Sequence, residues 1–256
     1  MPRRPDMTAR ILRQAHAAWV VAKKDAVVYY LKPPVINFGI ILPLFFYLAF
    51  AAGRAMPVEA MVPGIVAIAL FFTASAISPL VTPWERQART YERLVTSPAS
   101  LGAILAGDTL AGAAFGTILA LVPLTVGLVA TAARIADPTS LVLGIAFGAA
   151  AFATLGVLMA APASQAPAQV MMLSNLVRLP LMFVSGVFVP HAAMPDWGQW
   201  LAPLSPLSYA ADLIRLGFGE PGHFGAGIDT AALAAFTLAF LLLASVFHTR
   251  ARRNAR

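Results

Sequence analysis

The chain has 256 residues, of which 59% are hydrophobic and only 11% are charged, and its formal net charge is +7. Because a soluble domain carries about a quarter charged residues, this composition excludes an ordinary water-soluble protein and predicts an all-α integral membrane protein. The absence of cysteine excludes disulfide bonds and cysteine metal sites.

Residues 1–34 form a basic arm. We expect an amphipathic helix over 8–32 that lies at the membrane surface, with Trp19 on its apolar face and Lys23 and Lys24 on the other side. Consecutive prolines then end this helix. Two uses of the arm stay open at this point: an anchor on the lipid surface, or an anchor that also contacts a partner protein.

Six apolar stretches are long enough to cross a bilayer as helices, since about 20 residues at helical rise span its hydrocarbon core. The polar arm is too long for a signal peptide, so we expect the first stretch to be retained. The chain is predicted to be one transmembrane domain over 1–256, with a membrane region at 35–248 and a basic tail at 249–256. The predicted spans are 35–52, 60–83, 103–133, 141–161, 169–190 and 229–248.

The basic residues indicate the orientation of these spans. They gather in the arm, in the tail and in a charged segment at 84–100, whereas the loops of opposite parity hold few of them. Positive charge is enriched on the cytosolic side, so both termini and the charged segment are predicted to be cytosolic. The same distribution favours anionic lipid over nucleic acid as the partner of the basic residues.

Two segments between spans differ from simple loops. The charged segment 84–100 has a helix-forming, mixed-charge sequence and is predicted to form a short cytosolic helix between spans two and three. The segment 190–227 is rich in proline and tryptophan and is predicted to face outward, with short helices that dip partly into the membrane.

Several kinds of chemistry are missing. A P-loop needs glycines ahead of a lysine, but the last lysine, Lys32, precedes the first glycine, Gly39. The four histidines are far apart in the sequence and have no partners at metal-ligand spacing. We therefore predict no catalytic residue, no metal site and no cofactor bound by this chain.

Polar and small residues also occur inside the predicted spans. Arg178 lies near the middle of span five, one turn after Asn175. A charge at that depth must face protein or water, so this pair is a possible intramembrane polar site or, alternatively, part of a structural ion pair with Asp108. Small-residue faces in spans three and four favour close helix packing, within one subunit or across a dimer.

The charged segment resembles one found in the type-2 ABC exporter permease family. That family has an acidic-basic start, a Gly-Thr, a Glu-Arg-Leu and a closing proline. The matching residues here are Glu85, Arg86, Thr90, Glu92, Arg93, Leu94, Thr96 and Pro98. Gln87 and Arg89 depart from the family pattern, and Arg89 stands where glycine is usual. We expect these departures to favour helix through residue 89.

The external segment carries the second part of the resemblance. It has the sequence Ser-Gly-Val-Phe-Val-Pro at 185–190, Met-Pro-Asp-Trp at 194–197 and Pro-Leu-Ser-Pro-Leu-Ser-Tyr at 203–209, and it ends at Asp212 and Arg215. Together with the arm and the six spans, the resemblance covers nearly the whole chain.

The resemblance implies a dimer of such permeases, either two copies or a copy and a paralogue, bound to cytosolic ABC ATPase subunits that hold ATP and Mg. It also implies a multi-pass protein of the prokaryotic plasma (inner) membrane. The charged segment would then be the coupling element, with charged residues setting the docking and Tyr91 and Leu94 supplying buried area. The implied coupling residues are Glu85, Arg86, Arg89, Tyr91, Glu92, Arg93 and Leu94.

These features predict a permease subunit of an ATP-driven exporter with a drug-like or lipidic substrate. A relative that exports polysaccharide is one alternative. A secondary transporter driven by an ion gradient is another, although the inverted repeats typical of that class are not evident. A membrane-embedded enzyme is a third, weakened by the absence of clustered acids, histidines and cysteines.

Overall fold

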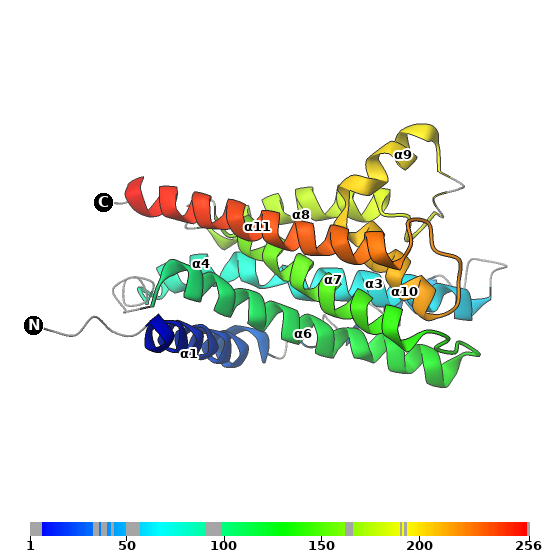
Figure 1. Cartoon of the computed structure of the whole chain (residues 1–256), viewed down its shortest axis with the longest axis horizontal. Helices are drawn as coiled ribbons and strands as arrows, with labels where there is room; N and C mark the ends of the chain where they lie inside the picture. Colours follow the sequence, from blue (N-terminus) through cyan, green and yellow to red (C-terminus); the bar gives the residue numbers. More distant parts are fainter. Residues whose placement is uncertain are drawn as a thin grey trace, which may run out of the picture.

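A computed structural model of the chain describes residues 7–32, 36, 40–41, 44–49, 57–90, 99–161, 166–189, 191 and 194–254. Within these residues the chain is helical and contains no strand, so the predicted all-α class is confirmed. Long helices lie roughly along one direction and form an elongated bundle (Figure 1). The charged ends of three helices lie together at one end of this bundle. These helices are α1 (Met7–Asp25), α4 (Ser78–Gln87) and α11 (Ala226–Asn254).

Five segments of the described chain are long and apolar enough to cross a membrane, and they match the predicted spans from 60–83 onward. The remaining predicted span, 35–52, lies mostly outside the described residues, so the count of six stays a prediction. The five segments are Val58–Glu85, Leu101–Ala130, Pro138–Met159, Pro167–Val184 and Ala226–Arg250. The last four correspond to α6 (Leu101–Ala130), α7 (Pro138–Met159), α8 (Pro167–Val184) and the apolar part of α11.

The span Val58–Glu85 is not a single regular helix. It begins with the 3-10 turn η2 (Val58–Met61), continues as α3 (Val62–Ala76), breaks at Ile77 and resumes as α4. Pro79 lies in the first turn of α4, and because proline has no backbone N–H to donate, it favours the start of a new helix over continuation of α3. The break divides an inner helix from the segment that carries the charged residues.

The core of the bundle is centred on α3. Almost every residue of α3 is buried, and it packs against α6, α7 and α10 (Pro206–Gly217). A helix that is apolar on all sides and buried on all sides is expected at the centre of a membrane bundle. By contrast, α8 and α11 are mostly exposed along their apolar windows, as expected of helices whose outer faces contact lipid.

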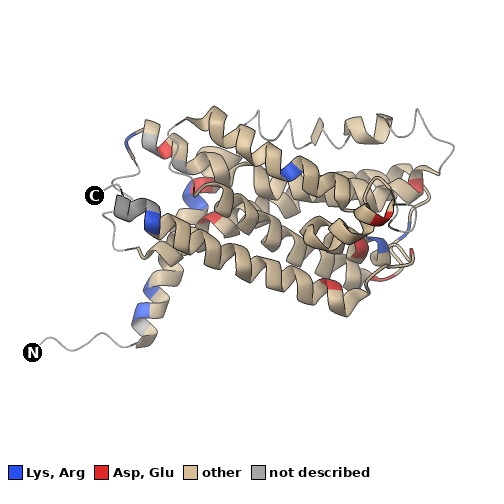
Figure 2. Ribbon diagram, turned by 90° about the horizontal axis from the view of Figure 1, so that it is seen from above, with Lys and Arg blue, Asp and Glu red and all other residues tan. Residues whose placement is uncertain are grey.

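The external segment contains a short helix α9 (Asp196–Leu201), a 3-10 turn η4 (Ala202–Leu204) and α10. The helix α10 is buried over most of its length and packs on α7, α11 and α3. These elements lie at the opposite end of the bundle from the charged ends of α1 and α4 (Figure 1). Charged residues gather at the two ends, and the long middle is nearly free of them (Figure 2).

The small-residue faces pack inside this one chain. A Cβ added at Gly116 of α6 would stand 2.5 Å from Cβ of Ala74 in α3, and one at Gly144 of α7 would stand 2.9 Å from Cβ of Leu213 in α10. A Cβ at Gly156 of α7 would stand 3.0 Å from the backbone oxygen of Ser75. Glycine therefore permits close backbone approach at three helix crossings of the core, and these faces are not free to form a dimer.

The crossing at Gly116 supports a stability prediction. The variant Gly116→Ala should lower the free energy of unfolding by about 1 to 2 kcal/mol, because overpacking outweighs the gain in helix propensity. Thermal unfolding of the purified chain in detergent measures this change. Gly227→Ala is the matched control, since no heavy atom lies within 4 Å of its added Cβ. A Gly116→Ala protein as stable as the wild type would contradict the close approach.

Candidate functional site

The charged segment begins at the end of α4, where the backbone turns sharply. The helix ends at Gln87, and Arg89 has a φ of 56°, in the left-handed region that favours glycine. The N–H of Thr90 then donates to the carbonyl of Glu85 over 2.9 Å, which closes a Schellman-type helix end. The expectation of helix through residue 89 is therefore wrong. Arg89 instead adopts the backbone conformation that suits the glycine usual at this position in the family it resembles.

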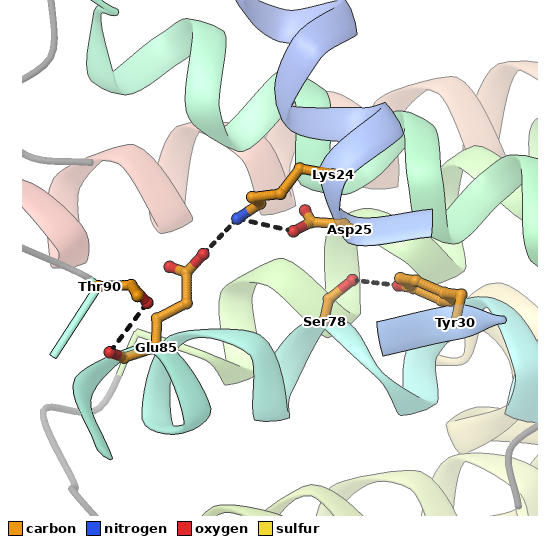
Figure 3. A network of polar contacts seen from close by, with 6 residues as sticks. All are labelled: Lys24, Asp25, Tyr30, Ser78, Glu85 and Thr90. Atoms are coloured by element: carbon orange, nitrogen blue, oxygen red, sulfur yellow. Dashed lines mark hydrogen bonds and ion pairs between the residues drawn. The ribbon is translucent and has the colours of Figure 1, made fainter. Parts of the chain in front are cut away.

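An ion-pair network joins α1 to α4 just before this turn (Figure 3). The ammonium of Lys24 contacts Oδ1 of Asp25 at 2.8 Å and also contacts Oε1 of Glu85. Both acids are buried, with Asp25 0% and Glu85 4% exposed. Burial by itself would lower the pKa of Lys24, but Asp25 and Glu85 outweigh it and raise this pKa above its ordinary value. Lys24 therefore stays charged and holds two buried carboxylates.

Aromatic contacts reinforce the same junction. The π-helical turn η1 (Ala26–Tyr30) follows α1, and the ring of Tyr29 stacks on that of Trp84 with centroids 5.6 Å apart. The hydroxyl of Tyr30, which is buried, lies 3.0 Å from Oγ of Ser78 in α4 (Figure 3). Burial and the charge of Glu85 raise the pKa of Tyr29 to about 12, so Tyr29 stays neutral. The end of the arm thus contacts α4 at two points, Ser78 and Trp84.

The middle of α1 contacts the far side of the charged segment. Oε1 of Gln14 accepts a hydrogen bond from the N–H of Ser100 over 2.9 Å, and Ser100 caps α6 by accepting from the N–H of Ala103. Between these points α1 lies directly on α6, since a Cβ added at Gly107 would stand 2.6 Å from the carbonyl oxygen of Ala18. The helix α1 therefore contacts both flanks of the segment 91–98.

We define the arm–segment junction as the residues that make these contacts. They come from three elements that are far apart in the sequence, the arm, the end of α4 and the start of α6. A displacement of the segment 91–98 would act on all three of them through short polar contacts. The members of the junction are Gln14, Lys24, Asp25, Tyr29, Tyr30, Ser78, Trp84, Glu85 and Ser100.

The acid Asp108 of α6 lies beside this junction and forms no ion pair with Arg178. Its carboxyl is in contact with that of Asp25 and feels the charges of Lys24 and Glu85. The alternative of an Arg178–Asp108 ion pair is therefore wrong. Its physical reason is the close approach of α1 to α6, which brings Asp25 to Asp108.

Arg178 of α8 is buried, and it contacts residues of its own helix and the aromatic ring of Phe72. Its guanidinium donates to the carbonyl of Ser174 at 3.3 Å and to Oδ1 of Asn175 at 3.0 Å, and it lies 5.7 Å from the ring centroid of Phe72. Among the described residues no carboxylate forms an ion pair with it. The predicted Asn175–Arg178 pairing is present, and its use in transport stays a prediction.

The remaining predicted residues fall into three groups. Tyr91, Glu92, Arg93 and Leu94 lie outside the described residues, as does the side chain of Arg86. Glu85 is engaged by Lys24 and is not available on the surface for a partner. Trp19, Lys23 and Arg89 are exposed.

Sequence reasoning missed the roles of Gln14, Asp25 and Ser100. The contacts of Gln14 with Ser100 and of Lys24 with Glu85 join residues 86 and 61 positions apart, which no local pattern reveals. The one available signal was Asp25, an acid at the end of a basic helix. In the described part of the chain, no group of three or more His, Asp or Glu residues is arranged to hold a metal ion.

Lys24 should be essential to the stability of the junction. The variant Lys24→Met leaves Asp25 and Glu85 buried without their cation, and we expect it to lower the free energy of unfolding by about 3 kcal/mol. The exposed neighbour is the matched control, and Lys23→Met should change this free energy by less than about 0.5 kcal/mol. Thermal unfolding in detergent compares the two. Equal effects of the two variants would show that the ion pairs contribute nothing.

The turn at Arg89 supports a second prediction, which separates the backbone from the charge. Arg89→Gly relieves the left-handed strain and should be more stable than Arg89→Ala by about 1 kcal/mol, while both variants lose the guanidinium. Unfolding temperatures of the two proteins give this difference. Identical temperatures would be inconsistent with the positive φ.

Comparison with known proteins places the chain in a family. The family described as "ABC-2 type transporter" matches residues 16–218. Nodulation protein J of Bradyrhizobium diazoefficiens is 28% identical over 257 residues, which covers 95% of this chain and 93% of that protein. Nodulation protein J of Sinorhizobium fredii is 28% identical over 249 residues, 93% of this chain and 91% of that protein.

A third relative is the daunorubicin resistance ABC transporter permease protein DrrB1 of Streptomyces coeruleorubidus. It is 29% identical over 147 residues, which covers 56% of this chain and 50% of the relative. The family match includes α1 from residue 16 onward, the charged segment and every other described element through α10, so it contains the whole arm–segment junction except Gln14. The chain belongs to the ABC-2 type transporter family.

Proposed function

We propose that this chain is the permease subunit of an ATP-driven exporter and receives energy from a separate cytosolic ATPase through the segment 91–98. The observation that carries the proposal is the contact of α1 with both flanks of that segment, through Lys24 and Glu85 on one side and Gln14 and Ser100 on the other. The chain lacks the glycine-lysine sequence of a P-loop, so the proposal assigns ATP binding to a partner.

The contacts offer a route for this energy. A partner that displaces the segment pulls on Glu85 at the end of α4, and α4 continues through the break at Ile77 into the central helix α3. The same displacement acts on α6 through its cap residue Ser100, and on α1 through Lys24. Since α3 packs against α6, α7 and α10, movement of α3 reaches the core. In this role Glu85 is a positioning residue, whereas Arg89, Glu92, Arg93 and Leu94 would meet the ATPase.

The proposed assembly contains two permease chains, identical or paralogous, and two ATPase subunits that bind ATP and Mg. We place it in the prokaryotic plasma membrane with both termini in the cytosol, because the basic ends of the chain lie together with the junction (Figure 2). On α1 the exposed side chains of Trp19 and Lys23 suit an interface with anionic lipid.

We propose a drug-like or lipidic substrate, in line with the apolar spans and with the name of the daunorubicin resistance relative. The alternatives are a polysaccharide substrate and transport driven by an ion gradient. Arg178 is buried near the middle of α8. Its burial supports the alternative of a transport path that is driven by an ion gradient or selects charge.

The deciding experiment replaces the predicted contact residues. In proteoliposomes that contain the chain and the ATPase that copurifies with it, the combined variant Glu92→Ala, Arg93→Ala and Leu94→Ala should lower ATP-dependent transport by about tenfold or more. Daunorubicin serves as the first probe and a labelled oligosaccharide as the second. Arg134→Ala, in the loop at the opposite end between α6 and α7, is the control and should transport normally.

Full transport by the triple variant with its ATPase bound would show that the segment does not couple the two proteins. A collapse of transport by a protonophore while ATP stays high would instead assign the energy to an ion gradient. The substrate class follows from which probe stimulates ATP hydrolysis.

A further inference from the structure

A second buried charge cluster lies at the end of the bundle opposite the junction. Asp212 of α10 is 2% exposed and Asp229, in the first turns of α11, is 0% exposed. Their carboxyl groups lie in side-chain contact with each other. The two residues join α10, α11 and the connector 218–225, which runs between these helices (Figure 1).

The two acids have different partners. Both oxygens of Asp212 accept from the N–H of His223 at 2.8 Å, and its Oδ2 also accepts from the N–H of Phe224 at 2.9 Å. These backbone N–H donors satisfy both oxygens of Asp212. Neither oxygen of Asp229 has a hydrogen-bond donor among the described residues.

No cation offsets the pair within the described part of the chain. The ion pairs found there involve Lys24 and Arg215, and Arg215 pairs with Glu220 at 3.9 Å while donating to the carbonyl of Gly186 at 2.7 Å. Two adjacent carboxylates buried without a cation repel each other and lack solvation, and such pairs are stable when they share one proton.

We propose that Asp212 and Asp229 form a proton-binding site, in which a protonated Asp229 donates its O–H to the carboxylate of Asp212. The proton removes the second charge and supplies the donor that Asp229 otherwise lacks. The protonated Asp212–Asp229 pair joins the start of α11 to α10. Through the backbone N–H groups of His223 and Phe224, it also holds the connector 218–225 in place. Loss of the proton leaves two buried anions in contact and releases the connector.

Other titratable groups surround the pair. Tyr209 of α10 is near Asp229, and the ring of His223 stacks on that of His191 with centroids 4.6 Å apart. Burial lowers the pKa of His191, and the neighbouring side chains of His223 and Arg215 lower it further. The rings are not the donors that Asp229 lacks. The Arg215–Glu220 pair lies on the same helix and connector, which makes Glu220 a matched control acid.

The proposed proton-binding site is independent of the proposed coupling to an ATPase. It is tested on the purified full chain in detergent. Hydrogen exchange is followed in peptides that cover 218–225, from about pH 5 to about pH 9, with a carboxyl C=O infrared band measured in parallel. In the wild type we expect protection of these amides to fall by about tenfold or more as pH rises, together with loss of the protonated-carboxyl band.

The variant Asp229→Asn replaces the protonated acid by an amide that can still donate to Asp212. It should keep the protection at every pH and lack the part of the infrared band that the wild type loses together with its protection, whereas Glu220→Gln should behave as the wild type. Each variant is compared with the wild type at the same pH, which cancels the intrinsic pH dependence of exchange.

Three results would overturn the proposal. The first is a pH-dependent carboxyl band in Asp229→Asn that equals the wild-type band in intensity, and the second is a pH dependence of protection removed by His191→Gln and not by Asp229→Asn. The third is recovery of protection at high pH when sodium replaces a large organic cation in the buffer, which would assign the site to a metal cation. The wild-type measurement also tests the proposal if a variant fails to fold, since protection of 218–225 that stays constant from about pH 5 to about pH 9 would contradict it.

Discussion

Charge buried in a membrane protein must be neutralised locally, and this constraint explains where the described charges of the chain lie. A carboxylate or ammonium transferred out of water loses solvation worth several kcal/mol, so it persists only beside an opposite charge, a set of donors or a shared proton. Lys24 meets this requirement at one end of the bundle by holding Asp25 and Glu85. At the other end of the bundle, the backbone N–H groups of His223 and Phe224 donate three hydrogen bonds to the carboxyl oxygens of Asp212. Between them, Arg178 takes its partners from Ser174, Asn175 and the face of Phe72.

This arrangement makes the arm a structural part of the permease and not only a lipid anchor. An anchor would need an apolar face for the membrane and a basic face for the headgroups, and the exposed Trp19 and Lys23 provide both. Another face of α1 is occupied by protein, because Gly107 lets α6 approach the backbone at Ala18 and because Val21 and Ala22 are buried. The helix thus has an exposed face suited to lipid and a second face packed on α6.

The break at Ile77 and the left-handed turn at Arg89 bracket the same short helix, α4. A helix with a hinge at one end and a sharp turn at the other can change its angle without unwinding, because the dihedral changes are confined to few residues. Its prolines reduce the hydrogen bonds that would hold it in line with α3. The ion pair of Glu85 with Lys24 joins this helix to α1. At the opposite end of the bundle, α10 is buried between α7, α3 and α11.

Hydrophobic periodicity and length were sufficient to predict the helical class and the later spans, since any helix that crosses a bilayer must be long and apolar. The charged segment was recognisable for the same reason, as charge where charge is scarce. Single residues inside helices were not predictable in this way. The sequence could not tell that Glu85 faces Lys24 and is unavailable to a partner, that Asp108 belongs with Asp25, or that Arg89 adopts a positive φ. Those outcomes depend on which helix faces meet, and only the packing of α1 on α6 and of α10 on α11 brings together groups that are dozens of residues apart.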